Sequence, residues 1–306
     1  MITALIFGSN GQDGFYLNKL LSNFGIQVYN ISRKNSEIIG DVSDYNFVKK
    51  IINEVKPNFI FHFAATSKTS HDFIFENHTS ISLGTINILE SVKLYSNNTK
   101  VFISGSALQF KNTGNPIDEF SEFDPSSAYA TSRIHSVYTA RYYREKFNLK
   151  IYIGYFFNHD SPLRNINHVN QKIVNACVNI SNGNVEKLIL GDITVKKEFS
   201  FAGDIVEAVW LFVNQNSVFE TAIGSGVAYS IIDWLKLCFS RFNLNWEDFV
   251  IIDNSLKNDN LTLVSNPKTI KEIGWKQKTN INELATIMID CELNKNINNN
   301  LNNVKR

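Results

Sequence analysis

The chain has 306 residues, of which 43% are hydrophobic and 19% charged, and its formal net charge is +1. This length supplies a sizeable core for one large domain or two smaller ones. The near-neutral charge gives no electrostatic reason to expect binding to nucleic acid or to a membrane surface. No apolar run approaches the roughly 18 residues that span a bilayer, and the first residues lack the basic region of a signal peptide.

The three cysteines, Cys177, Cys238 and Cys291, lie far apart in the sequence. Their spacing fits no metal-binding or redox motif, so we expect isolated thiols and no metal site. Unpaired thiols are typical of a reducing compartment, which favours a cytoplasmic location.

The first half of the chain alternates short β-branched or aromatic runs with longer amphipathic stretches. Strands are predicted at Ile2–Phe7, Gln27–Ile31, Phe59–Phe63, Lys100–Ser104 and Ile151–Tyr155. Helices are predicted between them at Asp13–Asn23, Asp44–Glu54, Thr79–Tyr95 and Ser127–Phe147. This alternation predicts βαβ units with right-handed crossovers, and therefore an α/β fold of the Rossmann type with a doubly wound parallel sheet.

The pattern loosens after residue 158. Here the predicted elements are helices at Asn170–Ser181, Gly203–Val213 and Ile281–Asp290, a strand at Lys187–Leu190 and a closing segment at Asn266–Trp275. We expect residues 1–157 to form the first domain, with residues 203–222 returning to it. Residues 158–202 and 223–292 are expected to form a smaller α/β lobe that binds substrate, and the Asn-rich residues 293–306 a disordered tail.

A glycine-rich run follows the first predicted strand and opens the first predicted helix. It reads Gly8, Ser9, Asn10, Gly11, Gln12, Asp13, Gly14. The GxxGxxG spacing lets the backbone turn tightly against a pyrophosphate at the N-terminus of the helix. In this strand–turn–helix context the run predicts a dinucleotide site.

The end of the second strand discriminates between the two dinucleotides. A carboxylate there binds the ribose 2′-hydroxyl, whereas a basic residue accommodates a 2′-phosphate. This chain has Arg33 and Lys34 and no carboxylate, which favours NADP over NAD. We expect Asp41 and Val42 to contact the adenine, and the alanines that follow the third strand to leave room for the cofactor. Those alanines are Ala64 and Ala65. His62, inside the third strand, is expected to be a packed residue.

Two further runs point to a known family. The sequence GQDGFYL at residues 11–17 resembles the GQDGxYL run of GDP-mannose 4,6-dehydratases, and FNHDSP at 157–162 resembles their FNHESP segment. Both belong to the extended short-chain dehydrogenase/reductases that act on nucleotide sugars, and the resemblance covers roughly residues 2–290. It implies a lobe that holds a nucleotide diphosphate, with Asn158 beside the sugar nucleotide and Lys197 where relatives place a phosphate-facing arginine.

The resemblance also implies a catalytic set, from which this chain departs at three positions. Tyr129 matches the family tyrosine that exchanges a proton with a sugar hydroxyl, but Arg133 stands where the Tyr-x-x-x-Lys pattern has lysine. Arginine can stabilise a tyrosinate and hold the nicotinamide ribose, but it does not relay protons. Tyr129 and Arg133 are therefore also expected to contact the cofactor. Gly105 replaces a hydroxyl residue, for which Ser106 is the substitute we expect. Ala107 replaces the glutamate that supplies acid–base catalysis in dehydration.

These departures favour a 4-keto reductase or a C4 epimerase acting on a GDP-sugar or similar compound in the synthesis of surface-polysaccharide sugars. A 4,6-dehydratase with rearranged acid–base residues is one alternative, for which Asp160 is a candidate carboxylate. The other alternative is a protein that binds the cofactor and the nucleotide sugar with attenuated catalytic turnover. The loop from Arg33 to Asp41 is short, whereas the dehydratases carry a long tetramer-forming loop there. A homodimer through the helices at Thr79–Tyr95 and Ser127–Phe147 is therefore expected.

Overall fold

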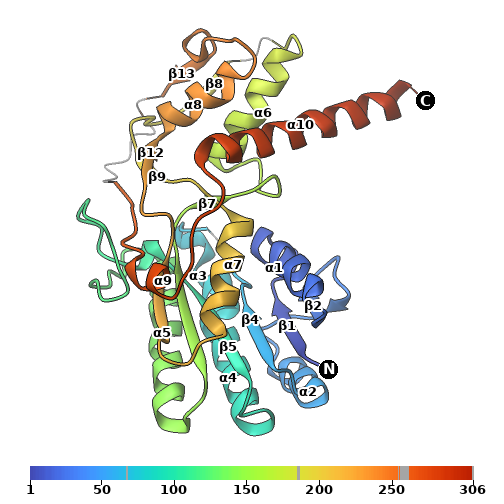
Figure 1. The fold of residues 1–306 in the computed structure, drawn as a ribbon, viewed down its shortest axis with the longest axis vertical. Coiled ribbons are helices and arrows are strands. Elements are labelled where there is room, and N and C mark those ends of the chain that lie inside the picture. Colours follow the sequence, from blue (N-terminus) through green and yellow to red (C-terminus); the bar gives the residue numbers. More distant parts are fainter. Residues whose placement is uncertain (67, 185–186, 254, 256–261, 305–306) are drawn as a thin grey trace.

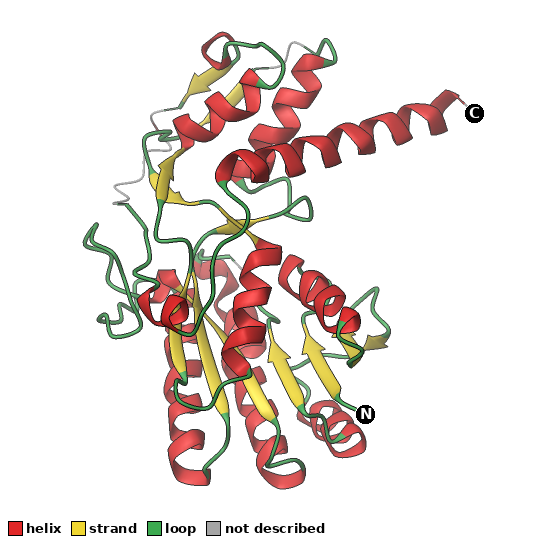
Figure 2. Cartoon of the chain, in the orientation of Figure 1, coloured by secondary structure: helices red, strands yellow, loops and turns green. Residues whose placement is uncertain are grey.

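The computed structural model describes residues 1–66, 68–184, 187–253, 255 and 262–304, with the backbone alone for 296–304. Its centre is a seven-stranded sheet in the order β11-β6-β5-β4-β1-β2-β3, and every neighbouring pair in it is parallel (Figures 1 and 2). The strands are β1 (Thr3–Phe7), β2 (Gln27–Ser32), β3 (Ile38–Ile39), β4 (Phe59–His62), β5 (Lys100–Ser106), β6 (Ile151–Phe156) and β11 (Glu220–Ile223). The predicted Rossmann-type fold is confirmed.

Helices cover both faces of this sheet, which is why its strands are almost continuously apolar. On one face lie α2 (Tyr45–Val55), α4 (Gly84–Tyr95) and α5 (Ala128–Phe147). On the other lie α1 (Gln12–Asn23) and α7 (Ala202–Val213). Residues 203–222 therefore run mostly as α7, packed against α1, and enter the edge strand β11.

The helix predicted at Thr79–Tyr95 is interrupted. Residues His78–Leu83 wind as a π-helix before α4 begins at Gly84, and η1 (His71–Phe73) and α3 (Ile74–Asn77) precede them. The carbonyl of Ile81 accepts hydrogen bonds from the hydroxyls of Thr85 and Ser136, at 2.8 and 3.1 Å. Buried hydroxyls from two helices thus satisfy a backbone group at the wider turn, where regular α-helical bonding is disrupted.

A second layer of elements lies beyond the carboxyl ends of the strands (Figure 1). Its helices α6 (Val169–Ser181), α8 (Ile231–Ser240) and α10 (Ile281–Val304) enclose a separate apolar core. At its centre the ring of Trp234 stacks on Phe199, with centroids 5.1 Å apart. The described part of the lobe also contains three two-stranded ladders: β7 (His159–Asp160) with β10 (Ser200–Phe201), β8 (Leu188–Leu190) with β13 (Val250–Ile252), and β9 (Lys196–Glu198) with β12 (Ala228–Ser230). Short elements complete the chain: η3 (Ala107–Gln109), η4 (Trp246–Asp248) and α9 (Lys268–Glu272).

The segment expected to form a disordered tail, residues 293–306, is described as helix up to residue 304. Helix α10 continues through residues 293–304 to Val304, while residues 305–306 lie outside the described part. Apolar residues recur every four positions, at Leu293, Ile297 and Leu301. That spacing is typical of one face of a helix, and the asparagine content of the segment masked it.

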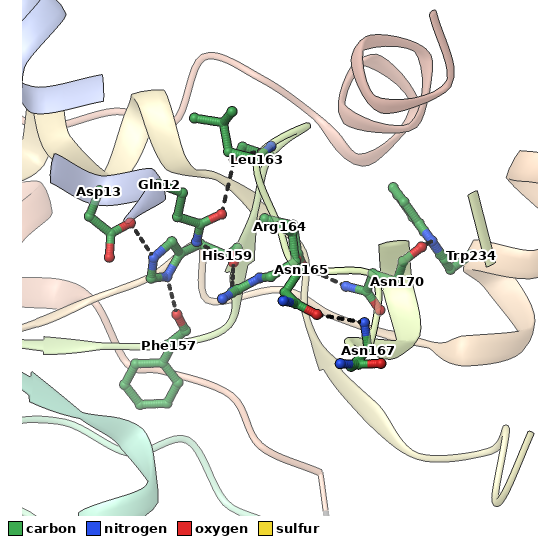
Figure 3. Close-up of polar contacts among 12 residues, drawn as sticks. Gln12, Asp13, Phe157, His159, Leu163, Arg164, Asn165, Asn167, Asn170 and Trp234 are labelled. Carbon is green, nitrogen blue, oxygen red and sulfur yellow. Dashed lines mark hydrogen bonds and ion pairs between the residues drawn. The ribbon is translucent and has the colours of Figure 1, made fainter. Parts of the chain in front are cut away.

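The two signature runs bind each other where the sheet meets the lobe (Figure 3). His159 donates from Nε2 to Asp13 Oδ1 at 2.8 Å and from Nδ1 to the carbonyl of Phe157 at 2.7 Å. The amide of Gln12 donates to the carbonyl of His159 at 3.1 Å and accepts from the hydroxyl of Ser161 at 3.0 Å. The first turn of α1 is thereby fixed to the segment that enters the lobe.

The same segment continues the contact into the lobe. Asp160 accepts from Arg164 Nε at 2.8 Å and from the side-chain amide of Asn170, in the first turn of α6. The indole of Trp234 in turn donates to the carbonyl of Asn170 at 3.2 Å. A continuous set of hydrogen bonds therefore joins α1 to the centre of the lobe core (Figure 3).

The Asp13–His159 contact favours the charged form of both side chains. Burial by itself would lower the pKa of His159, but the charge and hydrogen bond of Asp13 raise it above its ordinary value. Burial would raise the pKa of Asp13, but His159 and then Arg164 hold it below its usual range. Because both ring nitrogens of His159 face acceptors, the doubly protonated imidazolium is the form that satisfies them.

Replacing His159 by glutamine is expected to lower the free energy of unfolding by about 1–3 kcal/mol, because Asp13 keeps its burial but loses its charged partner. The contribution of Asp13 is present above its unfolded pKa of about 3.9 and is lost as pH falls. The contribution of His159 is fully present below about 6.5 and is lost as pH rises through its raised folded value. Urea unfolding at several pH values should thus show the largest deficit between about pH 4 and 6.5.

The matched control is Asp290→Asn, which breaks the exposed pair of Arg241 and Asp290 at 3.7 Å. It should change stability by less than about 0.5 kcal/mol at every pH. An equal loss in the two variants would show that the buried pair contributes no more than a surface ion pair.

Candidate functional site

Two glycines of the phosphate loop are required by close backbone contacts. Gly8 has a positive φ of 90°, and a Cβ on it would lie 2.6 Å from the amide nitrogen of Ala64. A Cβ on Gly14 would lie 2.6 Å from the carbonyl oxygen of Gly8. No side chain caps α1 at Gly11, so the N–H groups of its first turn are directed toward the space where a pyrophosphate would bind.

A cavity beside this loop gathers most of the predicted cofactor residues. It is lined by Gly8, Asn10, Gly11, Arg33, Asp41, Val42, Ala64 and Ala65, together with six further residues. The side-chain amide of Asn10 donates to the carbonyl of Lys34, and the hydroxyls of Ser9 and Ser36 lie 2.9 Å apart. These contacts hold the 33–36 loop beside the phosphate loop, with the exposed Arg33 at the rim.

This cavity fits a dinucleotide. Asp41 accepts from the amide and hydroxyl of Ser43 at 2.9 and 2.8 Å, so one of its oxygens is engaged within its own turn. No carboxylate follows β2 directly in the cavity lining, whereas Arg33 does. Gln12 and Asp13 instead line the neighbouring cavity, and their side chains bind Ser161 and His159.

That neighbouring cavity, which we call the sugar cavity, brings together the residues expected to carry the chemistry. Its lining includes Ser104, Gly105, Ser106, Ala107, Leu108, Tyr129, Arg133, Asn158, Arg164 and His168. Strand β5, helix α5 and the segment after β6 supply these residues, because the carboxyl ends of parallel strands meet at one edge of the sheet.

Tyr129 and Arg133 form a rigid buried pair, with 7% and 5% of their surfaces exposed. Arg133 Nε donates to the Tyr129 hydroxyl oxygen at 3.1 Å, and Nη1 donates to the hydroxyl of Ser104 at 2.9 Å and to its carbonyl. Since the guanidinium has no acceptor, the Tyr129 oxygen accepts from Arg133 and its O–H is directed to donate to another group. The fixed cation also stabilises a tyrosinate.

Position 105 has no room for a hydroxyl side chain. A Cβ there would lie 2.5 Å from the Tyr155 ring, which the hydroxyl bond to Glu220 at 2.7 Å holds in place. Ser106, one residue later, lines the sugar cavity instead. Its oxygen accepts from the amide of Leu108 at 3.2 Å, which leaves the hydroxyl proton available to a ligand.

The carboxylates near the sugar cavity are engaged by cations. Asp13 is paired with His159, and Asp160, which is 3% exposed, is bound by Arg164 and Asn170. Burial would raise the pKa of Asp160, but Arg164 and Lys197 hold it below its usual range. Among the lining residues of this cavity that the structure describes, Asp13 is the sole carboxylate. Asp160 is not among those lining residues.

A third cavity, the nucleotide cavity, adjoins the sugar cavity and has a volume of ≈ 560 Å³. Lys197 and Asn158 both line it, together with Val169 at the start of α6. Burial lowers the pKa of the Lys197 ammonium, the charge of Asp160 raises it and that of Arg164 lowers it again, with a net lowering. An anionic ligand would relieve this cationic crowding.

Sequence reasoning missed Arg164 and His168, which line the sugar cavity. Arg164 lies just beyond the recognised FNHDSP run, and nothing in its spacing distinguishes it from a surface arginine. The expectation that His62 is a packed residue is confirmed, because the side chain is 1% exposed and burial, followed by the charge of Arg133, lowers its pKa to about 3. Within the described ranges, no group of three or more His, Cys, Asp or Glu side chains is placed to hold a metal ion.

None of the described helices is both long and apolar enough to cross a bilayer. The thiols of Cys177 and Cys238 are buried, and that of Cys291 is half-buried.

The sequence and the fold are similar to those of known proteins. GDP-mannose 4,6 dehydratase 1 of Arabidopsis thaliana is 30% identical over 323 residues, covering 95% of this chain and 89% of the relative. The structure titled RMD from Pseudomonas aeruginosa complexed with NADPH has a TM-score of 0.86 at 16% identity, covering 96% of this chain and 100% of that one. UDP-glucose 4-epimerase of Thermus thermophilus, in complex with NAD, has a TM-score of 0.81 at 19% identity, covering 95% and 99%.

The sequence also matches the family described as GDP-mannose 4,6 dehydratase over residues 5–288. The matched region contains the phosphate loop, Tyr129 and the FNHDSP run, and so spans all three cavities. The chain therefore belongs to the GDP-mannose 4,6 dehydratase family.

Proposed function

We propose that the protein is an NADP-dependent oxidoreductase that transfers hydride at a ring carbon of a nucleotide sugar, as a 4-keto reductase or a C4 epimerase. One observation carries the proposal. The sugar cavity keeps a positioned proton donor, Tyr129, but holds Ala107 where dehydration needs a carboxylate. Ketone reduction requires one hydride and one proton, and neither comes from a carboxylate.

The residues of the sugar cavity have separate roles in the proposed hydride and proton transfer. The nicotinamide, when bound, supplies the hydride to the carbonyl carbon. Tyr129 gives its proton to the carbonyl oxygen, and Ser106 donates a hydrogen bond to the same oxygen. Arg133 stabilises the tyrosinate that results, and water returns the proton because arginine does not release one. Epimerisation uses the same groups in both directions.

NADP is supported by Arg33 at the cofactor cavity and by the lack of a carboxylate directly after β2 among its lining residues. A GDP-sugar is supported by the names of the family and of the relatives. Asn158 and Lys197 are proposed to bind its nucleotide end.

We also propose a homodimer through α4 and α5, because Tyr138 and Tyr142 of α5 are 58% and 55% exposed. The proposed location of the protein is the cytoplasm.

Family membership favours a second candidate, a 4,6-dehydratase. Such an enzyme must remove a proton beside the transient ketone and protonate the departing hydroxyl. With Ala107 in place of the glutamate, these steps would need a group that the family does not use. A protein that binds ligands without useful turnover is the third outcome of the following test.

The reaction type is decided by three incubations of the purified protein. With a GDP-4-keto-6-deoxyhexose we expect NADPH consumption and a product two mass units heavier, or, for an epimerase, isomerisation of a GDP-hexose without net cofactor use. With GDP-mannose alone, mass spectrometry should show no loss of water. Water loss there would assign the dehydratase instead, and thermal stabilisation by both ligands with no product would assign the binder.

Tyr129→Phe should lower kcat by at least about 10²-fold while leaving NADPH affinity nearly unchanged, because only the proton donor is removed. Stopped-flow NADPH oxidation and cofactor titration measure the two quantities. The matched control is Tyr45→Phe on α2, outside the three cavities, which should leave both unchanged. Full turnover in the Tyr129 variant would rule out this proton donor.

Arg133→Lys, although it restores the family residue, should lower kcat by roughly tenfold, because one charge-assisted hydrogen bond to Tyr129 or Ser104 is lost. The guanidinium reaches both partners at once, whereas a lysine ammonium is a single point charge. A rise in kcat would mean instead that the arginine impairs the site. Thermal unfolding of the variant separates a loss of activity from a loss of fold.

A further inference from the structure

His168 lies where the sugar cavity meets the nucleotide cavity. It lines the sugar cavity, and the next residue, Val169, lines the nucleotide cavity. Asn158 lines both. In a nucleotide sugar the diphosphate joins the sugar to the nucleoside, so a ligand that fills both cavities places its phosphates beside His168.

The surroundings of His168 are cationic. Lys197 reaches this region from β9 and Arg164 from the loop after β7. Arg164 is already engaged by Asp160 and by the carbonyl of His159. The Lys197 ammonium makes no hydrogen bond or ion pair within the described part of the chain, and its sole ring contact is with Phe199 at 5.5 Å. A second cation here suits an anionic ligand.

The imidazole of His168 makes no hydrogen bond to the residues that the structure describes. The residue is the N-cap of the 13-residue helix α6, but its side chain makes no capping hydrogen bond, and among the described residues its ring has no hydrogen-bond partner. The N–H groups of the first turn of α6 therefore lie uncapped beside it. The ring and the helix terminus can both donate to the same phosphate oxygens.

Four influences act on the charge of this ring. Partial burial lowers the pKa of His168, Arg164 lowers it further, Asp160 raises it and Lys197 lowers it, with a net lowering from the ordinary value. The residue is exposed as a whole, and the partial burial of its ring is the largest of these effects. In the free protein these influences together favour the neutral ring.

We propose that His168 is a ligand of the substrate diphosphate that takes up a proton as the nucleotide sugar binds, so that substrate affinity depends on pH. The inference rests on the proposed function in one respect, that the ligand is a nucleotide diphosphate. It adds a specificity-determining residue that is independent of the reaction catalysed.

The direction in which substrate affinity changes with pH follows from the linkage between substrate binding and protonation of His168. The negative diphosphate raises the pKa of His168 in the complex above its pKa in the free protein. At a pH between these two pKa values, binding therefore takes up a proton. Affinity is greatest at low pH, falls as pH rises through the value of the complex, and then levels off. Each unit by which the pKa rises on binding strengthens binding at low pH by about tenfold.

Isothermal titration with GDP-mannose, without NADPH, tests this between about pH 5.5 and 8.5 in buffers of different ionisation enthalpy. The two phosphates of this probe carry no monoester group and do not titrate in that range. We expect the wild type to take up nearly one proton at the optimum, and the affinity to fall as pH rises. His168→Gln should take up none, and its affinity should be flat with pH.

Two further variants complete the design. His168→Lys carries a permanent charge, so it should bind as tightly at high pH as the wild type does at low pH, without proton uptake. The control is His71→Gln, at an exposed histidine in η1 that lines none of the three cavities, and it should behave as the wild type. Circular dichroism confirms that each variant is folded.

Equal proton uptake by the wild type and His168→Gln overturns the inference while leaving the proposed function intact. Uptake that is lost in the variant, in a protein that proves to be a dehydratase or a binder, supports the inference and overturns the function. If GDP-mannose does not bind, UDP-glucose replaces it as the probe in the same series. Failure of both probes to bind the wild type overturns the function and the inference together.

Discussion

The architecture depends on one buried ion pair, that of Asp13 and His159. Asp13 belongs to the first turn of α1, where the phosphate loop ends, and His159 belongs to the strand that leads into the lobe. Because the pair is desolvated, each charge needs the other, and the segment cannot leave the loop without exposing an unpaired charge. The phosphate loop that lines the cofactor cavity and the segment around His159 that lines the sugar cavity are thereby held together.

The same contact explains why two distant runs carry the family signature. The GQDG run supplies an amide and a carboxylate, and the FNHDSP run supplies their partners, Ser161 and His159. A substitution on either side would leave a buried group unsatisfied, which costs more than the bond itself contributes. The signature therefore reflects the hydrogen bonds that the two runs make with each other, in addition to any contact with a ligand.

The departures near Tyr129 also form a consistent set. Arg133 is longer than lysine, and its guanidinium reaches Tyr129 and Ser104 together. Gly105 leaves space that the ring of Tyr155 fills, so the hydroxyl function moves to Ser106. These adjustments give a packed and hydrogen-bonded site. That argues against a pocket that has lost its catalytic residues one by one, and Ala107 remains the change that alters the chemistry.

The sequence by itself determined the parallel sheet, the positions along the chain of five of its strands and the position of the phosphate loop, because hydrophobic periodicity and glycine spacing are local properties. It also placed Tyr129 and Arg133 on one helical face, four residues apart. Only the tertiary structure decided what those residues touch. The pairing of Asp13 with His159, the loss of space at Gly105 and the location of His168 between two cavities depend on segments far apart in the chain, whose contacts no local pattern encodes.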